Sequence, residues 1–294
     1  MKNGFAIFFA VLVALGGSWL GFVVAPAIQL GQAKQATILN STDTWPLQRT
    51  GEATLGLQVY RANGCVACHT EQIRQEGVAA EITLTGLGNS KPENFKAFVQ
   101  SLFVLPELGK VTNRLAATLK DWKGDLPATV LTTDDKAIAD AMADRLKAAG
   151  VKAETRIVAT GADLPRWGVR RSVAADFLYD YPVQLGSLRV GPDLADVGAR
   201  LPDANWQLLH LYAPKVSVTN SAMPSFKFLF EVRKKINGQS SPDALNLPKD
   251  FAPAAGSEVV PKPEAKQLVA YLLSLRADVP LFEAPFSPVT SAKP

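Results

Sequence analysis

The segment Cys65-Val66-Ala67-Cys68-His69 holds both cysteines of this 294-residue chain and one of its two histidines. Two thiols at this spacing can reach the two vinyl groups of one porphyrin, while the imidazole of the next residue approaches the iron from one face. This is the attachment pattern of haem c. The sequence therefore predicts one covalently bound haem c, with Cys65 and Cys68 as thioether positions and His69 as an iron ligand.

Two other functions use Cys-x-x-Cys. Zinc sites of this kind need a second ligand cluster, and the chain has no further cysteine. A redox dithiol needs neither the following histidine nor export from the cytoplasm. Thiol–disulfide exchange therefore stays as the alternative to haem attachment.

Methionine is the usual second axial ligand in electron-transfer cytochromes. The chain has three: Met1 starts it, and Met142 lies in a helical stripe where an apolar side chain is typical of a core. Met223 lies in a loop, where Pro224 keeps the chain extended and can present the thioether sideways. We expect Met223 to be the sixth ligand.

His210 is the alternative sixth ligand. It belongs to the apolar helical segment 206–212, where its simplest role is to pack at the edge of the haem. If neither side chain filled the site, an open iron would favour haem-based sensing or peroxidase activity.

A second motif, Gly191-Pro192-Asp193-Leu194, fits the other side of His69. The Pro192 carbonyl can accept the Nδ1–H of His69 and so fix the tautomer that leaves Nε2 for iron. Arg200, shortly after, can pair with a haem propionate. Taken alone, the same residues also fit a simple turn and a surface arginine.

The N-terminus predicts a membrane anchor over residues 1–31. Residues 4–25 carry no charge, and about 22 helical residues at 1.5 Å each span roughly 33 Å, enough to cross a bilayer. Ala25-Pro26-Ala27 is a poor cleavage site because of its central proline, so the anchor is expected to stay. Covalent haem attachment occurs outside the bacterial cytoplasmic membrane, which places the rest of the single-pass chain in the periplasm.

The remaining composition is that of a folded body. The chain is 47% hydrophobic and 20% charged, and its net charge of +4 includes no basic run, so nucleic acid is not an expected partner. After a polar linker at 32–51, helices at 53–60 and 263–275 are expected to cross. Gly56 would allow their close approach, and Tyr60 would pack on Tyr271.

Residues 78–162 have a different pattern, which predicts an inserted α/β unit. The order is β-α-α-β-α-β, with strands at 81–85, 128–132 and 153–158 and helices at 94–105, 108–122 and 134–149, the last ending at Gly150. This order, and the phrase at 143–154, resembles the C-terminal domain of the bacterial ribosomal stalk protein. The resemblance implies a fold and no function.

The order of motifs in the rest of the chain resembles the membrane-anchored monohaem subunit, subunit II, of cbb3-type cytochrome c oxidase. The most particular match is Tyr179-Asp180-Tyr181-Pro182 leading to Gly186-Ser187. The other matching positions are 46–47, Tyr60, 64–69, 72–74, 167–168, 176–178, Gln184, Arg189, 191–194, Gly198, Arg200, 210–211, Pro214 and 223–224.

This resemblance implies an α-helical c-type domain with His69 and Met223 as axial ligands. It further implies electron transfer to the haem–copper catalytic subunit, in a complex that holds other cytochrome c subunits. The chain would not reduce oxygen by itself. A stand-alone anchored cytochrome that shuttles electrons between complexes is the alternative.

The expected fold is therefore mainly α. It has a transmembrane helix and a class I-like cytochrome c domain built from 52–77 and 163–294, interrupted by the insertion at 78–162. His69 and Met223 are 223 − 69 = 154 residues apart. Without the insertion of about 85 residues, about 70 remain between them, which suits a small haem domain.

Overall fold

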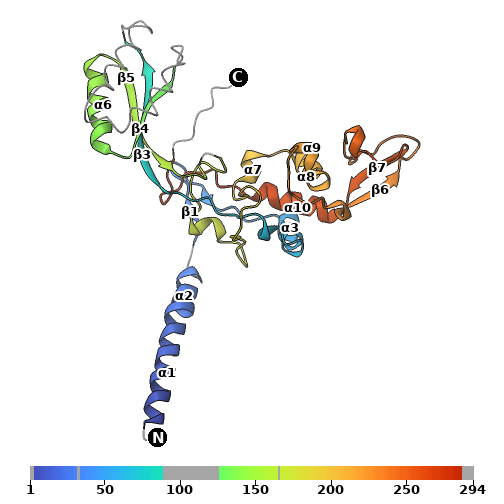
Figure 1. Ribbon diagram of the computed structural model, residues 1–294, viewed down its shortest axis with the longest axis horizontal. Helices are drawn as coiled ribbons and strands as arrows, with labels where there is room; N and C mark the ends of the chain where they lie inside the picture. The colour runs from blue at the N-terminus through green and yellow to red at the C-terminus, as the bar shows by residue number, and fades with distance from the viewer. Residues whose placement is uncertain (1–2, 32–33, 89–125, 165, 287–294) are drawn as a thin grey trace.

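The computed structural model describes residues 3–31, 34–88, 126–164 and 166–286. Figure 1 shows a long N-terminal helix that leaves the rest of the molecule, an α/β unit, and a body that contains the crossing helices. The predicted helices at 94–105 and 108–122 lie outside the described residues.

The N-terminal helix runs without a break through α1 (Gly4–Trp19), a π-helical turn (Leu20–Val24) and α2 (Ala25–Gly31). The wider turn comes just before Pro26, which has no amide hydrogen to continue the regular pattern. Residues Gly4–Gln29 have a mean hydropathy of 2.3 over their most apolar window, and none of that window is buried. By length and composition this helix is compatible with a membrane anchor.

The predicted linker is attached to the body. Strand β1 (Ala36–Thr37) pairs with β2 (Thr44–Trp45) in antiparallel register. Trp45 is buried beside Val173 and Leu281, and its indole Nε1–H donates to Asp176 Oδ1 at 2.7 Å. These partners lie more than 120 residues away in the chain, so the local composition gave no sign of them.

The predicted helix crossing is confirmed by α3 (Gly51–Ala62) and α10 (Pro263–Ser274). Thr50 caps α3 by accepting the amide of Ala53 through its side chain, and a proline occupies the first turn of α10. A Cβ at Gly56 would clash with the carbonyl oxygen of Gln267. The rings of Tyr60 and Tyr271 meet with centroids 5.2 Å apart.

Short elements complete the body around this crossing. The helical segments are η2 (Cys65–Ala67), η4 (Ala174–Phe177), α7 (Val197–Arg200), α8 (Ala204–Tyr212), α9 (Pro214–Ser217), η5 (Lys227–Leu229) and η6 (Lys249–Phe251). Strands β6 (Phe230–Lys234) and β7 (Ser257–Pro261) form an antiparallel hairpin. Leu211, Phe230 and Leu268 belong to the core that joins α3, α8, α10 and the hairpin.

The α/β unit has its own core. Strands β3 (Gly77–Gly86), β4 (Ala128–Thr133) and β5 (Lys152–Thr160) form an antiparallel sheet in the order β4-β3-β5, and α6 (Lys136–Ala148) packs on it. Gly150 follows α6 with φ of +74°, as expected of a helix stop. Met142 is buried in this core with Ile82 and Leu84, apart from the haem motif.

The expectation of a mainly α chain is therefore only partly correct, because helices and antiparallel sheets are both present among the described residues. The β6–β7 hairpin was not predicted. Its strands are five residues long and their intervening loop is long, so neither gives a clear alternating pattern. The class I-like cytochrome c domain stays a prediction.

Candidate haem site

The Cys-x-x-Cys-His motif begins where α3 ends. Gly64 has φ of +65°, a conformation that favours glycine, and it turns the chain into η2. The amide of His69 then donates to the carbonyl oxygen of Cys65 at 3.0 Å. This compact turn brings both cysteines and His69 to one place, with both thiols free, Cys65 half-buried and Cys68 exposed.

His69 has the predicted contact with Pro192. Its Nδ1 lies 2.8 Å from the Pro192 carbonyl oxygen, which leaves Nε2 free of that bond. Two backbone hydrogen bonds enclose the pair: the Gly191 amide donates to Cys68 O at 2.9 Å, and the Leu194 amide donates to Thr70 O at 2.8 Å. A side chain at Gly191 would occupy the space of the imidazole ring. The structure thus orients His69 as an iron ligand requires, although ligation itself stays a prediction.

Met223 joins the same apolar core as the haem motif. Met223, Cys65 and Val66 are half-buried and pack against the cluster that contains Tyr60 and Leu268. The loop that carries Met223 is anchored by the Phe226 amide, which donates to Leu211 O at 2.9 Å. Of the two candidate methionines inside the body, Met223 is therefore the one placed near the motif.

His210 lies on α8, where its ring stacks on Trp206 with centroids 4.8 Å apart. Burial lowers the pKa of His210, and the charge of nearby His69 lowers it further. Its Nδ1 is buried and has no hydrogen-bond partner in the described part of the chain. Both observations fit a neutral histidine that could pack against a haem or bind its iron.

Arg200 also has a buried nitrogen that lacks a hydrogen-bond partner among the described residues. Its Nη2 donates to the carbonyl oxygen of Asp193 at 2.7 Å, whereas its Nε is buried without a partner among the described residues. Burial also lowers the pKa of this guanidinium. A buried, unused donor of this kind suits an anionic acceptor such as a carboxylate.

These features fit a haem. The turn supplies two free thiols and an oriented imidazole, the core supplies a thioether, and Arg200 and His210 each present an unused buried nitrogen. Among the described residues no group of three or more His, Cys, Asp and Glu side chains is placed to hold a bare metal ion.

The Cys65 thiol does not have the environment of a reactive dithiol. Burial raises the pKa of Cys65 to about 11. Thiol–disulfide exchange proceeds through the thiolate, and its catalytic cysteines have lowered pKa values. The structure therefore disfavours this alternative.

A buried acid next to the motif was not predicted from the sequence. Glu71 is 1% exposed and accepts the phenol of Tyr271 through both carboxylate oxygens at 2.9 Å. Burial raises the pKa of Glu71 to about 7, although Tyr271 and the charge of Arg49 act in the opposite direction. The residue was overlooked because a lone Glu after the motif looks like a surface residue.

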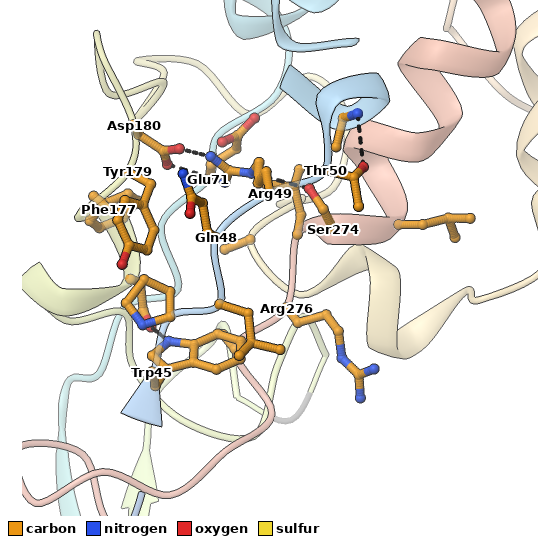
Figure 2. Close-up of a pocket in the computed structure, with 18 of the residues that line it drawn as sticks. Trp45, Gln48, Arg49, Thr50, Glu71, Phe177, Tyr179, Asp180, Ser274 and Arg276 are labelled. Carbon is orange, nitrogen blue, oxygen red and sulfur yellow. Dashed lines mark hydrogen bonds and ion pairs between the residues drawn. The ribbon is translucent and has the colours of Figure 1, made fainter. Parts of the chain in front are cut away.

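A cavity of about 330 Å³ lies beside Glu71. Figure 2 shows Arg49 at its wall, paired with Asp180 and directed to Ser274 Oγ at 3.1 Å. The segment predicted as a linker, residues 32–51, contributes Trp45, Gln48 and Thr50 to the same wall. The segment that follows the anchor therefore forms part of the wall of the cavity beside Glu71, two residues after the haem motif.

A second group that was not predicted is the cluster of Asp163, Arg189 and Asp193, which joins the segment after the haem motif to the Gly-Pro-Asp-Leu loop. Its two carboxylates are buried and Arg189 is half-buried. Asp193 and Arg189 are positions of the family resemblance, but nothing in the sequence indicates that they pair with each other or with Asp163.

Residues 154–252 match the family model described as cytochrome c oxidase, mono-heme subunit/FixO. The matched segment, about a third of the chain, includes Pro192, Arg200, His210 and Met223, while Cys65 and its neighbours lie outside it. No curated protein matches the chain. The match supports a relationship to the subunit II family of cbb3-type oxidases, and that family implies one haem, electron transfer and partner subunits of an oxidase.

Proposed function

We propose that this protein is a membrane-anchored c-type cytochrome that passes electrons to the haem–copper catalytic subunit of a cbb3-type oxidase. The hydrogen bond between His69 Nδ1 and Pro192 O, at 2.8 Å, carries the proposal. It joins the haem-attachment motif to the segment that matches the monohaem oxidase subunit. Two separate parts of the chain, each with its own indication of haem, thus meet at one imidazole.

A haem c bound here would supply a reversible one-electron centre. Cys65 and Cys68 would hold it covalently, and His69 and Met223 would bind its iron, so that no position is left for a substrate. Pro192 would fix the His69 tautomer, and Arg200 would pair with a propionate. The apolar core on which Met223 packs would lower the polarity around the haem.

An exposed apolar strip favours a permanent partner over a stand-alone shuttle. The strip consists of Tyr181, Val183, Leu185, Leu188 and Val190, with Tyr181 93%, Leu188 60% and Val190 65% exposed. The one charged residue within the segment, Arg189, turns inward to Asp163 and Asp193. Exposed apolar side chains close together in the sequence, with the one charge among them paired inward, suit a protein interface that stays covered. A partner seated here would lie close to the haem motif, because the Glu71 amide donates to Leu185 O at 3.1 Å.

The location and the domain division belong to the same proposal. Haem attachment outside the cytoplasm favours a periplasmic body on a single membrane span. An insertion at 78–162 is supported by the closeness of its two ends. The Glu76 amide, just before it, donates to Thr160 O near its end at 2.8 Å. The chain therefore enters and leaves the α/β unit at one point. The likeness of this unit to the ribosomal stalk domain remains our interpretation, as do the cytochrome segments 52–77 and 163–294.

Optical spectra of the full chain purified from membranes test the haem site. We expect a c-type spectrum with the weak sulfur–iron band at the red end of the ferric form and no binding of carbon monoxide. Met223→Ala should lose that band and gain carbon monoxide binding. Met142→Leu, in the separate α/β core, is the matched control and should leave both properties unchanged.

Three outcomes would contradict the proposal. Carbon monoxide binding by the unchanged protein would mean an open sixth site and would favour sensing or catalysis. Retention of the sulfur–iron band in Met223→Ala would rule out Met223 as the ligand. Absence of a Soret band, together with titration of a dithiol, would favour the thiol redox alternative.

A further inference from the structure

We infer that Arg189 is a positioning residue that holds the Pro192 carbonyl against the imidazole of His69 and thereby helps to set the reduction potential of the haem. The inference rests on the proposed function and deepens it. It assigns a role to a side chain that would act through Pro192 and not through contact with the iron.

Arg189 uses all of its guanidinium nitrogens. Nε donates to Thr70 Oγ1 at 2.8 Å, and Nη1 and Nη2 each donate to one carboxylate oxygen of Asp163 at 2.8 Å. Nη2 also donates to the carbonyl oxygen of Gln72 at 2.5 Å. The guanidinium carbon lies 4.8 Å from the centre of the Trp167 ring. Such a two-pronged Arg–carboxylate pair fixes both distance and orientation.

These contacts connect the two segments that form the His69–Pro192 pair. Thr70 and Gln72 directly follow His69, whereas Arg189 precedes Pro192 by three residues. Asp193 completes the connection: its Oδ2 accepts Thr70 Oγ1 at 2.5 Å and the Gln72 amide at 2.9 Å, and it lies 3.4 Å from Arg189 Nη2. These side chains therefore constrain, from one side, the distance between the His69 imidazole and the Pro192 carbonyl.

Charge makes Arg189 the central member of this cluster. Asp193 is fully buried and the side chain of Asp163 is 6% exposed, so two carboxylates lie out of water close to one guanidinium. Removing one partner from a buried ionic group is costly, because the remaining charges are left uncompensated. A lysine would keep the charge but can offer only a compact ammonium in place of the planar guanidinium. The two backbone hydrogen bonds and the Asp193 contacts would then hold the segments with less constraint on the distance between the imidazole and the carbonyl.

The hydrogen bond at Nδ1 controls the donor strength of the imidazole. A short Nδ1–H···O=C bond increases electron density on the ring and favours the more highly charged ferric iron. When the Pro192 carbonyl moves away, this support weakens and the ferrous form gains. The expected direction is thus a higher reduction potential when Arg189 loses its geometry.

Arg189→Lys in the full-length holoprotein tests whether the geometry of Arg189 affects the reduction potential. Lysine keeps the positive charge, so a change would come from the lost guanidinium geometry. We expect the ferrous-to-ferric ratio at a fixed applied potential to rise about tenfold, equivalent to about 59 mV for one electron. We also expect the Nδ1–H proton of His69, followed by NMR after ¹⁵N-histidine labelling, to exchange with solvent at least about tenfold faster. The sulfur–iron band should remain, because the substitution does not alter Met223 or its contacts.

Arg170→Lys is the matched control. Arg170 is buried and forms an equally two-pronged pair with Asp176, at 2.9 and 2.7 Å, but it does not touch the segments around His69. We expect a similar loss of thermal stability in both lysine variants, with an unchanged potential and unchanged exchange in Arg170→Lys. Should Arg189→Lys fail to mature, Asp163→Asn weakens the same pair from its other side and should show the same faster exchange.

An unchanged potential and an unchanged Nδ1–H exchange in a folded Arg189→Lys or Asp163→Asn protein would overturn the inference. A change of equal size in Arg170→Lys would overturn it as well, because the effect would then be general loosening. Either result leaves the proposed function standing as long as the unchanged protein shows the c-type spectrum. Failure of the proposed function would instead appear in the unchanged protein, as the absence of that spectrum.

Discussion

At the scale of single residues, the candidate haem site depends on atoms whose partners come from distant parts of the chain. His69 Nδ1 faces a carbonyl 123 positions away, and Asp193 accepts both Thr70 and Gln72. Two buried nitrogens of the site, Arg200 Nε and His210 Nδ1, have no hydrogen-bond partner among the described residues. Buried polar atoms are rarely left unpaired, so both are compatible with the proposed haem.

Asp196 offers a pH-dependent prediction at this scale. Its Oδ1 accepts the Ala277 amide at 2.7 Å, and burial raises the pKa of Asp196 from 3.8 to about 6. The folded state therefore holds this proton more tightly than the unfolded chain. The free energy of unfolding should fall as the pH rises from about 4 to about 6 and level off above that, by an amount on the order of 3 kcal/mol for this group.

Asp196→Asn should remove this part of the pH dependence, because asparagine does not titrate. Denaturant unfolding at several pH values between 4 and 7 measures it, with Asp203→Asn, an exposed capping residue of α8, as the control. An undiminished fall in stability in Asp196→Asn would show that other groups cause it.

At the scale of elements, the crossing of α3 and α10 places the motif. The end of α3 leads directly into the haem-attachment turn, and α10 supplies the tyrosine that binds Glu71. The two backbones come close because Gly56 has no side chain at the contact with Gln267. A displacement of α10 would therefore be transmitted to both Glu71 and the turn.

Gly56→Val should destabilise the protein by roughly 1–3 kcal/mol, because the new side chain would meet the backbone of α10. Gly51→Val, at the start of the same helix, is the control, since nothing lies within 4 Å of that position. Thermal or denaturant unfolding of the two variants gives the comparison. Equal destabilisation would mean that the change in helix propensity, and not the crossing, is responsible.

At the scale of the whole molecule, the described residues form three parts: the N-terminal helix, the α/β unit and the body around α3 and α10. The N-terminal helix is apolar all round and is compatible with a membrane anchor. The α/β unit and the body around α3 and α10 (Figure 1) each have their own core, and the body carries the candidate haem site and the apolar strip. Among the described residues the strip is exposed, apolar and hydrogen-bonded to the segment that follows the haem motif, so under the proposed function it is a surface for a partner.

Leu188→Lys tests that assignment, because a charge buried at an interface centre costs at least about 2 kcal/mol, roughly thirtyfold in affinity. We expect less of the haem–copper subunit to co-purify with the chain from detergent-solubilised membranes, measured by mass spectrometry as the ratio of that subunit to this chain. The optical spectrum of the chain itself should not change. Val232→Lys, an exposed apolar position on β6, is the control. A constant ratio in Leu188→Lys would place the partner elsewhere.

The sequence by itself determined the features that depend on neighbours in the chain. The spacing of Cys65, Cys68 and His69 is local, as are the uncharged apolar run after Lys2 and the helical periods of α3, α6 and α10. The contact of Pro192 with His69 and the crossing at Gly56 were also predictable, because each belongs to a recognisable motif or a residue type with one physical use.

Only the tertiary structure decided which charges are buried and with what. Asp163 and Glu71 look like surface residues in the sequence, and the partners that bury them, Arg189 and Tyr271, lie 26 and 200 positions away. The pairing of β6 with β7, and with it the mixed α/β character, has the same origin. Short strands and buried ion pairs gain their stability from long-range contacts, and these contacts leave no periodic signal in the segments that make them.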